Sequence, residues 1–456
     1  MKTKFLYFGI ACWLALLPAC KKGFLDQRPN KALLVPSTVA DLRALLDNTL
    51  VFNTTPGLTL VADGDFYTTN TAYQSFSLDM ERNSYTWAKD IFAAVPAPDW
   101  NIPYQQIFYA NVVLEGVSKL AADTSAERRA VQGTALFSRA YALFNLAQEF
   151  AAPYTAATAN SAPGVPVRLS SDVNLHIQRG NVQQAYNQVI ADLNAARSLL
   201  PATTAYKSRP TAAAAQALLA RVSLSMGNYP LAARYADSVL AGNPPLIDYN
   251  TLNAASTRPF PRALPDGNDE VLYYSVLVSY SFNSSAAQTF IDSGLYRSYD
   301  VNDLRKGLFY RELTPGNFKF KGNYAGTLQL FSGLATDELY LISAECRARA
   351  GKAQAALDRL NTLLAKRWRS ETFVPLVAAD APAALRLVLT ERRKELPARN
   401  LRWSDLRRLN TDPAFAVTLD RTILGGVYSL APGSKRYVFP IPDEEIRLEG
   451  LQQNER

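Results

Sequence analysis

Residues 337–366 read DELYLISAECRARAGKAQAALDRLNTLLAK, and this stretch decides the predicted fold. It predicts a helix, a turn at Gly351 and a second helix. The same layout occurs at 211–241, where a turn around Gly227 separates two helix-favouring, alanine-containing halves. Small residues recur in both stretches at identical spacings of 7 and 5: Ala220, Gly227 and Ala232 in one, and Ala344, Gly351 and Ala356 in the other. Alanine-rich faces allow two helices to approach closely, so each stretch predicts a tightly packed helix pair.

Other segments predict helices of the same kind. Residues 182–200 carry apolar side chains at alternating spacings of four and three and end at Pro201, as expected for an amphipathic helix. Residues 104–120 and 126–150 predict a third pair. Helix pairs with small residues at fixed spacing are typical of tetratricopeptide repeats. Because these pairs lie far apart in the sequence, they predict a mainly α helical bundle with long loop insertions and a few short strands, not a regular solenoid.

Three insertions separate the predicted helix pairs, at residues 51–104, 151–181 and 242–335. The first and third are rich in aromatic residues. The apolar run at 271–278 in the third predicts a buried strand. Loops longer than about 12 to 15 residues in a compact protein usually carry function. We therefore expect a ligand site in these insertions.

Composition excludes several classes of function. The 456 residues include one histidine, His176, and three cysteines. These are too few to form a His/Cys metal site, and they leave little chance of a Cys–His nucleophile pair. We expect no metal and no cofactor, and we expect Cys346 to be a small buried apolar residue. The net charge is +8, from 48 basic and 40 acidic side chains, and half of the excess lies in 391–408. This local excess does not predict a nucleic-acid ligand.

The N-terminus has the pattern of a secretory leader. Two lysines precede an apolar run from Phe5 to Leu17, which is shorter than the roughly 20 apolar residues that span a bilayer. The run ends in Leu-Pro-Ala-Cys, which resembles a bacterial lipobox. We predict that residues 1–19 are a signal peptide and that Cys20 is acylated and anchors the protein to a membrane. The alternative is an ordinary secretory leader with a chance cysteine.

A set of short motifs follows in order along almost the whole chain. The motifs are Gly23-Phe24-Leu25-Asp26, Ala151-Ala152-Pro153-Tyr154, Gly164-Val165-Pro166-Val167, Asp303-Leu304-Arg305, Glu338-Leu339-Tyr340-Leu341-Ile342-Ser343-Ala344-Glu345, Glu391-Arg392-Arg393-Lys394-Glu395-Leu396, Leu401-Arg402-Trp403-Ser404-Asp405-Leu406 and Arg436-Tyr437-Val438-Phe439-Pro440. In this order they resemble the SusD/RagB family, nutrient-binding outer-membrane lipoproteins of the Bacteroidota. One motif alone is weak evidence, but the ordered set is specific.

The resemblance implies a single SusD-like body over residues 20–456, with an N-terminal part of about 24–241 and a C-terminal part of about 242–456. It implies four tetratricopeptide-like helix pairs. It also implies a non-catalytic lipoprotein on the outer face of the outer membrane, which captures oligosaccharide and delivers it to a SusC-like TonB-dependent transporter for nutrient uptake. The alternatives are a peptide-binding RagB-type member, a periplasm-facing tetratricopeptide-like envelope scaffold and a lipid-anchored hydrolase. For the hydrolase, no pair of carboxylates stands out as catalytic.

Aromatic residues of the first and third insertions are the candidate ligand contacts. The C–H face of a sugar packs on an aromatic ring, while its hydroxyls bond to polar side chains. Ser, Thr, Asn or Asp residues lie close to six of the insertion aromatics, which we predict to contact the ligand: Tyr67, Tyr73, Phe76, Tyr280, Phe282 and Tyr296. His176 is interpreted as a loop or packing residue, not as a catalytic base.

The charged stretch at 391–408 has two interpretations. Its arginines could form a patch for anions. The acidic residues among them, and the central tryptophan, favour an internal ion-pair network that closes the C-terminal part onto the bundle. The predicted members of this network are Glu391, Arg392, Glu395, Arg402, Trp403, Asp405 and Arg407.

Overall fold

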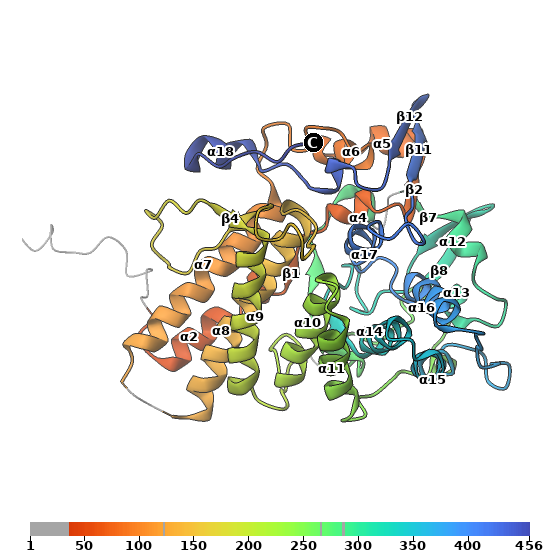
Figure 1. Cartoon of the computed structure of the whole chain (residues 1–456), viewed down its shortest axis with the longest axis horizontal. Helices are drawn as coiled ribbons and strands as arrows, with labels where there is room; N and C mark the ends of the chain where they lie inside the picture. The colour runs from red at the N-terminus through yellow and green to blue at the C-terminus, as the bar shows by residue number, and fades with distance from the viewer. Residues whose placement is uncertain (1–35, 122–123, 265–266, 285–287) are drawn as a thin grey trace, which may run out of the picture. The chain divides into compact units, whose positions relative to one another are not determined.

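The computed structural model describes residues 36–121, 124–264, 267–284 and 288–456, and within them a row of eight helices forms the frame (Figure 1). Each helix packs against the next: α7 (Pro98–Lys119), α8 (Ala126–Phe150), α9 (Val182–Leu199), α10 (Ala212–Ser225), α11 (Tyr229–Leu240), α14 (Thr336–Arg349), α15 (Ala353–Leu364) and α16 (Ala381–Glu395). A shorter helix, α2 (Val39–Leu46), packs on α7 and α8. The predicted mainly α fold class is confirmed. The predicted signal peptide and Cys20 lie outside the described residues.

The two repeated helix pairs form as their spacing predicts. The turns between α10 and α11 and between α14 and α15 contain Gly227 and Gly351, with φ of +70° and +79°. This left-handed conformation strains most residues but not glycine. The equivalent alanines on the four helices, Ala220, Ala232, Ala344 and Ala356, are all fully buried, so the small side chains lie where helices pack closely.

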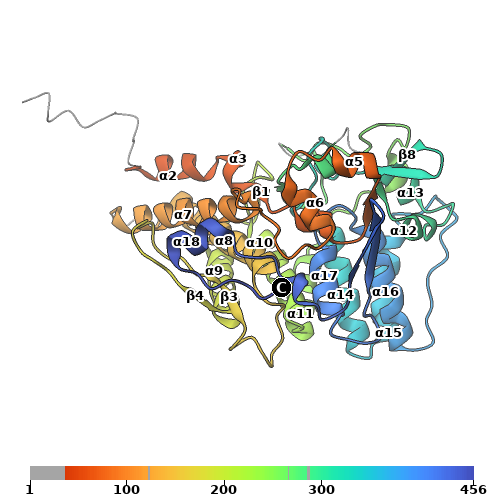
Figure 2. The same cartoon turned by 90° about the horizontal axis from the view of Figure 1, so that it is seen from above.

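The first and third insertions pair with each other, although about 200 residues separate them. Strand β1 (Thr54–Thr55) runs parallel to β6 (Val276–Leu277), and β2 (Phe66–Thr68) is antiparallel to β7 (Thr289–Ile291). The strand predicted at 271–278 is divided into β5 (Val271–Tyr273) and β6, and β5 pairs with β10 (Leu334–Ala335). Seen from above, the insertions form a second layer beside the row of helices (Figure 2).

Short elements complete the insertions and the C-terminal segment. The first insertion also contains α3 (Thr49–Phe52), α4 (Thr59–Ala62), α5 (Asn70–Gln74) and α6 (Asp79–Tyr85). The second, expected as a loop, includes the strand pair β3 (Pro163–Pro166) and β4 (Arg179–Asn181). The third adds α12 (Ser293–Arg297), α13 (Leu304–Phe309), β8 (Tyr310–Thr314) and β9 (Asn317–Phe320). The C-terminal segment contains α17 (Arg402–Leu409), β11 (Leu419–Ile423), β12 (Gly426–Leu430) and α18 (Asp443–Glu449).

Residues from Thr38 to Arg456 belong to one compact unit with a shared hydrophobic core. The predicted division of the body near residue 241 remains a prediction. Cys346 is buried, as predicted, and His176 is an exposed loop residue whose Nδ1 lies 3.0 Å from Glu449. No helix of the described residues has the length and apolar character needed to cross a bilayer.

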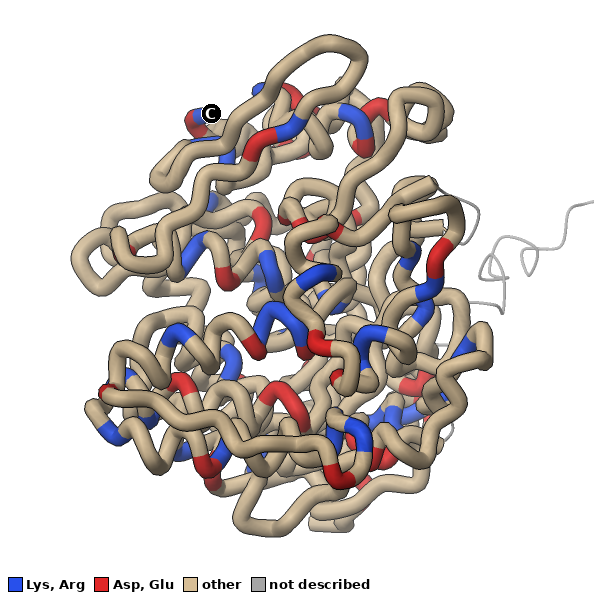
Figure 3. Tube along the Cα trace, turned by 90° about the vertical axis from the view of Figure 1, so that its right-hand side faces the viewer, with Lys and Arg blue, Asp and Glu red and all other residues tan. Residues whose placement is uncertain are grey.

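Helix α14 carries three buried carboxylates, and each binds an arginine from a different element. The closest nitrogen–oxygen distances are 2.6 Å for Asp337 with Arg399, 2.6 Å for Glu338 with Arg221 and 2.5 Å for Glu345 with Arg408. These arginines lie on α10, on α17 and on the loop before α17, so α14 holds three elements at once. Figure 3 shows that acidic and basic positions are interspersed along the chain throughout the body.

The charged residues predicted to form a C-terminal network lie in contacts of the same kind. Arg392 bonds to Asp405 at 2.8 Å, Glu391 and Glu395 bind Arg305 at 2.5 and 3.0 Å, and Arg402 lies 3.7 Å from Asp65. Trp403 is buried against Tyr437 and Phe439. Arg407 differs, because it bonds to the backbone carbonyls of Ala147 and Ala151 and to no carboxylate among the described residues. The network extends beyond 391–408, since Arg305 and Asp65 lie outside that stretch.

Breaking one buried pair should destabilise the fold strongly. In Arg221→Met the Glu338 carboxylate loses its bidentate partner in the core, so we expect the free energy of unfolding to fall by about 3–5 kcal/mol. Urea unfolding followed by circular dichroism measures this change. The matched control is Arg447→Met, which removes an exposed pair with Glu444 and should cost less than about 1 kcal/mol. Equal effects of the two substitutions would contradict the role given to the buried pairs.

Candidate functional site

The two aromatic-rich insertions are held together by buried carboxylates as well as by strands. The Glu81 carboxylate accepts hydrogen bonds from the Ser281 hydroxyl at 2.9 Å and from the Phe282 backbone N–H at 2.7 Å. The Asp99 carboxylate accepts from the Tyr280 hydroxyl at 2.7 Å and from the backbone N–H groups of Gly57 and Leu58. We call the region where these insertions meet, residues 54–99 and 271–331, the insertion junction.

Three of the six predicted ligand contacts are core residues of this junction. Phe76, Tyr280 and Phe282 are 4%, 4% and 0% exposed. The rings of Phe76 and Phe282 lie 5.7 Å apart in an edge-to-face contact, and Tyr280 bonds to Asp99. In this structure these side chains stabilise the junction and offer almost no surface to a ligand. The expectation that they contact ligand is corrected accordingly, because polar neighbours in the sequence did not place them at the surface.

The other three predicted contacts are partly exposed, and two of them flank strand β9. The Tyr67 hydroxyl donates a hydrogen bond to Asn317 at 2.5 Å, and the Tyr296 ring stacks on Phe318 with centroids 3.6 Å apart. The Lys306 ammonium lies 5.1 Å from the centroid of the Tyr296 ring. Tyr73 lies apart from them, with its hydroxyl bonded to the Arg82 carbonyl. Tyr67 and Tyr296 therefore contact adjacent residues of β9, and we call the partly exposed rings around this strand, Tyr67, Tyr296 and Phe318, the aromatic surface.

Strand β9 also borders a small pocket of about 40 Å³. Its apolar lining consists of Leu60, Phe66, Phe282, Phe320, Leu330 and Ala398. The polar lining consists of Asn283, Ser284, Thr289 and Lys319. The Lys319 ammonium donates to the Ser284 carbonyl at 3.1 Å, and burial lowers the pKa of Lys319 to about 8. With this volume the pocket holds only a few water molecules, so a ligand at the junction would lie on the partly exposed rings around the pocket rather than inside it.

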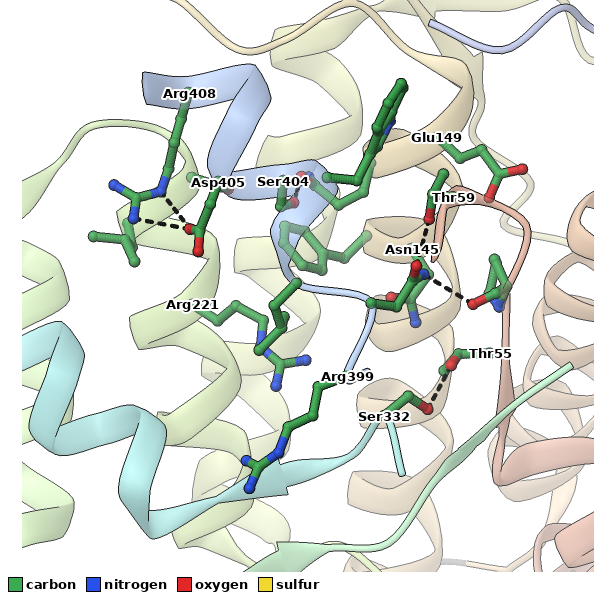
Figure 4. A pocket seen from close by; sticks show the side chains of 18 of the residues that line it. Thr55, Thr59, Asn145, Glu149, Arg221, Ser332, Arg399, Ser404, Asp405 and Arg408 are labelled. Atoms are coloured by element: carbon green, nitrogen blue, oxygen red, sulfur yellow. Dashed lines mark hydrogen bonds and ion pairs between the residues drawn. The ribbon is translucent and has the colours of Figure 1, made fainter. Parts of the chain in front are cut away.

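A second pocket, shown in Figure 4, is equally small. Its volume of about 40 Å³ leaves room for a few water molecules. Arg221, Arg399 and Arg408 line it, and each is held by a carboxylate of α14. Thr55 bonds to Ser332 across one side at 2.6 Å. This cavity belongs to the internal ion-pair network rather than to a nutrient site.

The β8–β9 hairpin contributes residues that the sequence interpretation missed. Asn317, Phe318 and Lys319 contact or border the aromatic surface and the pocket, yet none of them was a candidate. A signal for them exists in the sequence, since Pro315-Gly316 precedes an alternating run of polar and aromatic residues at 317–320. This pattern is typical of a hairpin strand with one aromatic face.

The comparison with known families decides what kind of protein carries this junction. A family described as starch-binding and associating with the outer membrane matches residues 23–224, and the SusD family matches residues 336–456. The chain belongs to the SusD/RagB family. It is therefore a member of a carbohydrate-binding family whose proteins associate with the cell envelope and are not enzymes.

Solved structures with the same fold support this membership. A SusD superfamily protein from Bacteroides thetaiotaomicron is 22% identical, with a TM-score of 0.69 over 92% of this chain and 100% of that one. A SusD superfamily protein from Bacteroides vulgatus is 19% identical, with a TM-score of 0.72 over 92% and 99%. A SusD-like carbohydrate binding protein from Bacteroides vulgatus is 18% identical, with a TM-score of 0.66 over 91% and 97%. No curated protein matches the sequence.

Two buried carboxyl groups under the junction make its stability sensitive to pH. Burial raises the pKa of Asp99 to about 6, and burial together with Asp99 raises the pKa of Glu149 well above its ordinary value. The folded protein thus binds more protons than the unfolded chain from about pH 4 upward. The stabilisation that proton binding by Asp99 and Glu149 gives to the folded state is fully present below about pH 4. It is lost as the pH rises through 6.

Replacing one of these carboxyl groups should make the stability of the protein fall less steeply as the pH rises. Between pH 5 and pH 8, we expect the free energy of unfolding of the wild type to fall relative to that of Glu149→Gln, because the raised pKa of Glu149 makes the folded state release its proton in this range. Urea unfolding at both pH values measures the difference, and Glu371→Gln, in an exposed loop, is the control. Parallel pH profiles for wild type and Glu149→Gln would show that the pair does not titrate in this range.

Proposed function

We propose that this protein captures oligosaccharide at the insertion junction, without chemical turnover. The observation that carries the proposal is that two aromatic insertions, distant in sequence, join beside the helical row and present Tyr67 and Tyr296 next to a pocket with a polar rim. Membership of a carbohydrate-binding family supports the same ligand class.

The chemistry of the junction fits a sugar. The stacked Tyr296 and Phe318 rings form a flat, rigid apolar surface, against which the C–H face of a pyranose ring packs. Asn317 and Lys306 lie within reach of the same surface and carry hydrogen-bonding groups for sugar hydroxyls. Since Phe318 and Tyr296 hold each other in place before ligand binds, little side-chain entropy is lost on binding.

The proposed cellular setting follows from the leader and from the family. Cys20 carries lipid and anchors the protein to the outer membrane, with its body facing the exterior. A SusC-like TonB-dependent transporter receives the captured oligosaccharide. Holding the binding protein beside the transporter converts the second encounter into an effectively intramolecular one, which raises the local concentration of ligand.

Two alternatives lead to different experimental results. A peptide-binding RagB-type member would bind peptides rather than glycans, and a glycan array combined with a peptide panel distinguishes these ligands. A periplasm-facing scaffold would be protected from protease added to intact cells, whereas an outward-facing protein is cut. The described aromatic surface favours the glycan interpretation, because ring stacking suits a pyranose face better than an extended peptide backbone.

The aromatic surface can be removed without disturbing the core. For Tyr67→Ala/Tyr296→Ala, we expect at least a tenfold rise in the Kd for the oligosaccharide selected on the array, equivalent to about 1.4 kcal/mol. Isothermal titration calorimetry measures the change. Tyr206→Ala, which removes an exposed tyrosine from the loop between α9 and α10, is the matched control and should leave the Kd unchanged.

The buried aromatics provide a second comparison. Phe282→Leu should lower stability while leaving the aromatic surface in place, since Phe282 is fully buried. If the double variant binds as tightly as the wild type, the junction is not the binding site.

A further inference from the structure

A groove of about 980 Å³ lies away from the insertion junction, along the C-terminal segment. Four groups of residues line it: the loop after α8 (Ala152, Pro153, Thr155, Thr158, Ser161 and Pro163), strand β4 (Arg179, Gly180 and Asn181), α17 and its end (Arg407, Asn410 and Thr411), and the C-terminal segment (Gly433, Ser434, Lys435, Tyr437, Val438 and Gln452 to Glu455). Its volume would admit several sugar units, whereas the pocket at the junction holds only a few water molecules.

Two arginines in this groove lack acidic partners. Arg179 donates to the Gly164 carbonyl at 2.9 Å, to the Gln452 carbonyl at 2.6 Å and to Asn454 Oδ1 at 2.7 Å, all of them neutral groups. Arg407 donates only to the carbonyls of Ala147 and Ala151. Its Nε has no hydrogen-bond partner in the described part of the chain, although the side chain is 95% buried. Neither arginine forms an ion pair with a described residue.

This arrangement differs from that of most buried arginines among the described residues, although Arg421 also donates only to backbone carbonyls. The arginines bound to α14, such as Arg221 and Arg408, each lie within 2.7 Å of a carboxylate. A charge removed from water without a partner is costly, and burial accordingly lowers the pKa of Arg179 and of Arg407 to about 10. Glu149 faces Arg407, but its own raised pKa favours the protonated, neutral form. An anion bound in the groove would supply the missing charge.

The remaining lining matches the rest of an acidic sugar. Hydroxyl groups of Thr155, Thr158, Thr411 and Ser434 border the groove together with the amides of Asn181 and Asn410. Lys435 lies at the rim, where it pairs with the exposed Glu455. Groups that both donate and accept hydrogen bonds suit sugar hydroxyls, and an arginine has five N–H donors in a fork that matches an oxyanion.

We propose that this groove is a second ligand site, which binds the oxyanion of an acidic oligosaccharide, a carboxylate or a sulfate, through Arg179. The proposal rests on the proposed glycan-binding function and adds a substrate class to it. Arg407 holds the end of α8, and its buried guanidinium adds positive potential beneath the groove. Lys435 raises the positive potential at the entrance.

Matched acidic and neutral ligands test the proposal by calorimetry. The probes are tetragalacturonate, its fully methyl-esterified form and a sulfated chondroitin tetrasaccharide. We expect at least one acidic probe to bind at least about tenfold more tightly than the neutral ester, because a charge-assisted hydrogen bond is about twice as strong as a neutral one. The acidic probe that binds more tightly identifies the oxyanion. Equal affinities for all three probes, or no binding of either acidic probe, would overturn the proposal.

Substitutions locate the binding within the groove. Arg179→Gln should lower the affinity for the acidic probe at least about tenfold. Lys435→Gln, at an exposed position, should lower it about threefold. Arg386→Gln, on the exposed face of α16, is the matched control and should have no effect. Full affinity in both groove variants would overturn the proposal.

The junction variant separates this proposal from the first one. Tyr67→Ala/Tyr296→Ala should keep the tenfold preference for the acidic probe. Loss of that preference would place the oxyanion at the junction and overturn the groove site. If neutral oligosaccharide binds at the junction and acidic probes gain nothing, the proposed function stands and the groove proposal fails.

Discussion

Buried ion pairs between arginines and carboxylates are the interaction on which the arrangement of this protein depends. Helix α14 alone binds arginines from α10, from α17 and from the loop before α17. Helix α16 extends the same chemistry to the insertions, since Arg393 binds Asp65 at 2.7 Å and Glu395 binds Arg305 and Arg367. Asp65 directly precedes β2, and Arg305 lies on α13, so these pairs fix both aromatic insertions to the helical row. Buried pairs of this kind impose geometry more than they add stability, because desolvation offsets much of their attraction.

The consequence for the proposed function is an aromatic surface that exists before ligand arrives. The junction draws most of its residues from two segments outside the helical row, with Asp99 at the start of α7, and it keeps its shape because strands, Glu81 and Asp99 connect them. Partly exposed rings such as Tyr296 and Phe318 lie at the surface, and Tyr296 packs on the buried ring of Tyr310. The helical row supplies a frame, and in our proposal the insertions supply the recognition chemistry.

The sequence predicts the frame well and the site only in part. Helix pairs depend on local spacing, so Gly227, Gly351 and the alanines around them were sufficient to predict two of the pairs. The contact of Thr54 with Val276 depends on the whole fold, and no local pattern indicates it. For the same reason polar neighbours could not distinguish buried Phe282 from half-exposed Tyr67. The charged stretch at 391–408 predicted ion pairs; Arg392 and Asp405 form one and Arg407 forms none, and partners such as Arg305 could be identified only in three dimensions.

A crystal structure of the protein with its bound oligosaccharide tests the central claim most directly. The claim is that the insertion junction, held in place by the buried ion pairs, is where a neutral oligosaccharide is captured. We predict sugar rings packed against Tyr296 and Tyr67 beside β9, intact after prolonged incubation, with the junction backbone unchanged from the free protein. An oligosaccharide bound on the helical row, or a junction that forms only in the complex, would contradict the account.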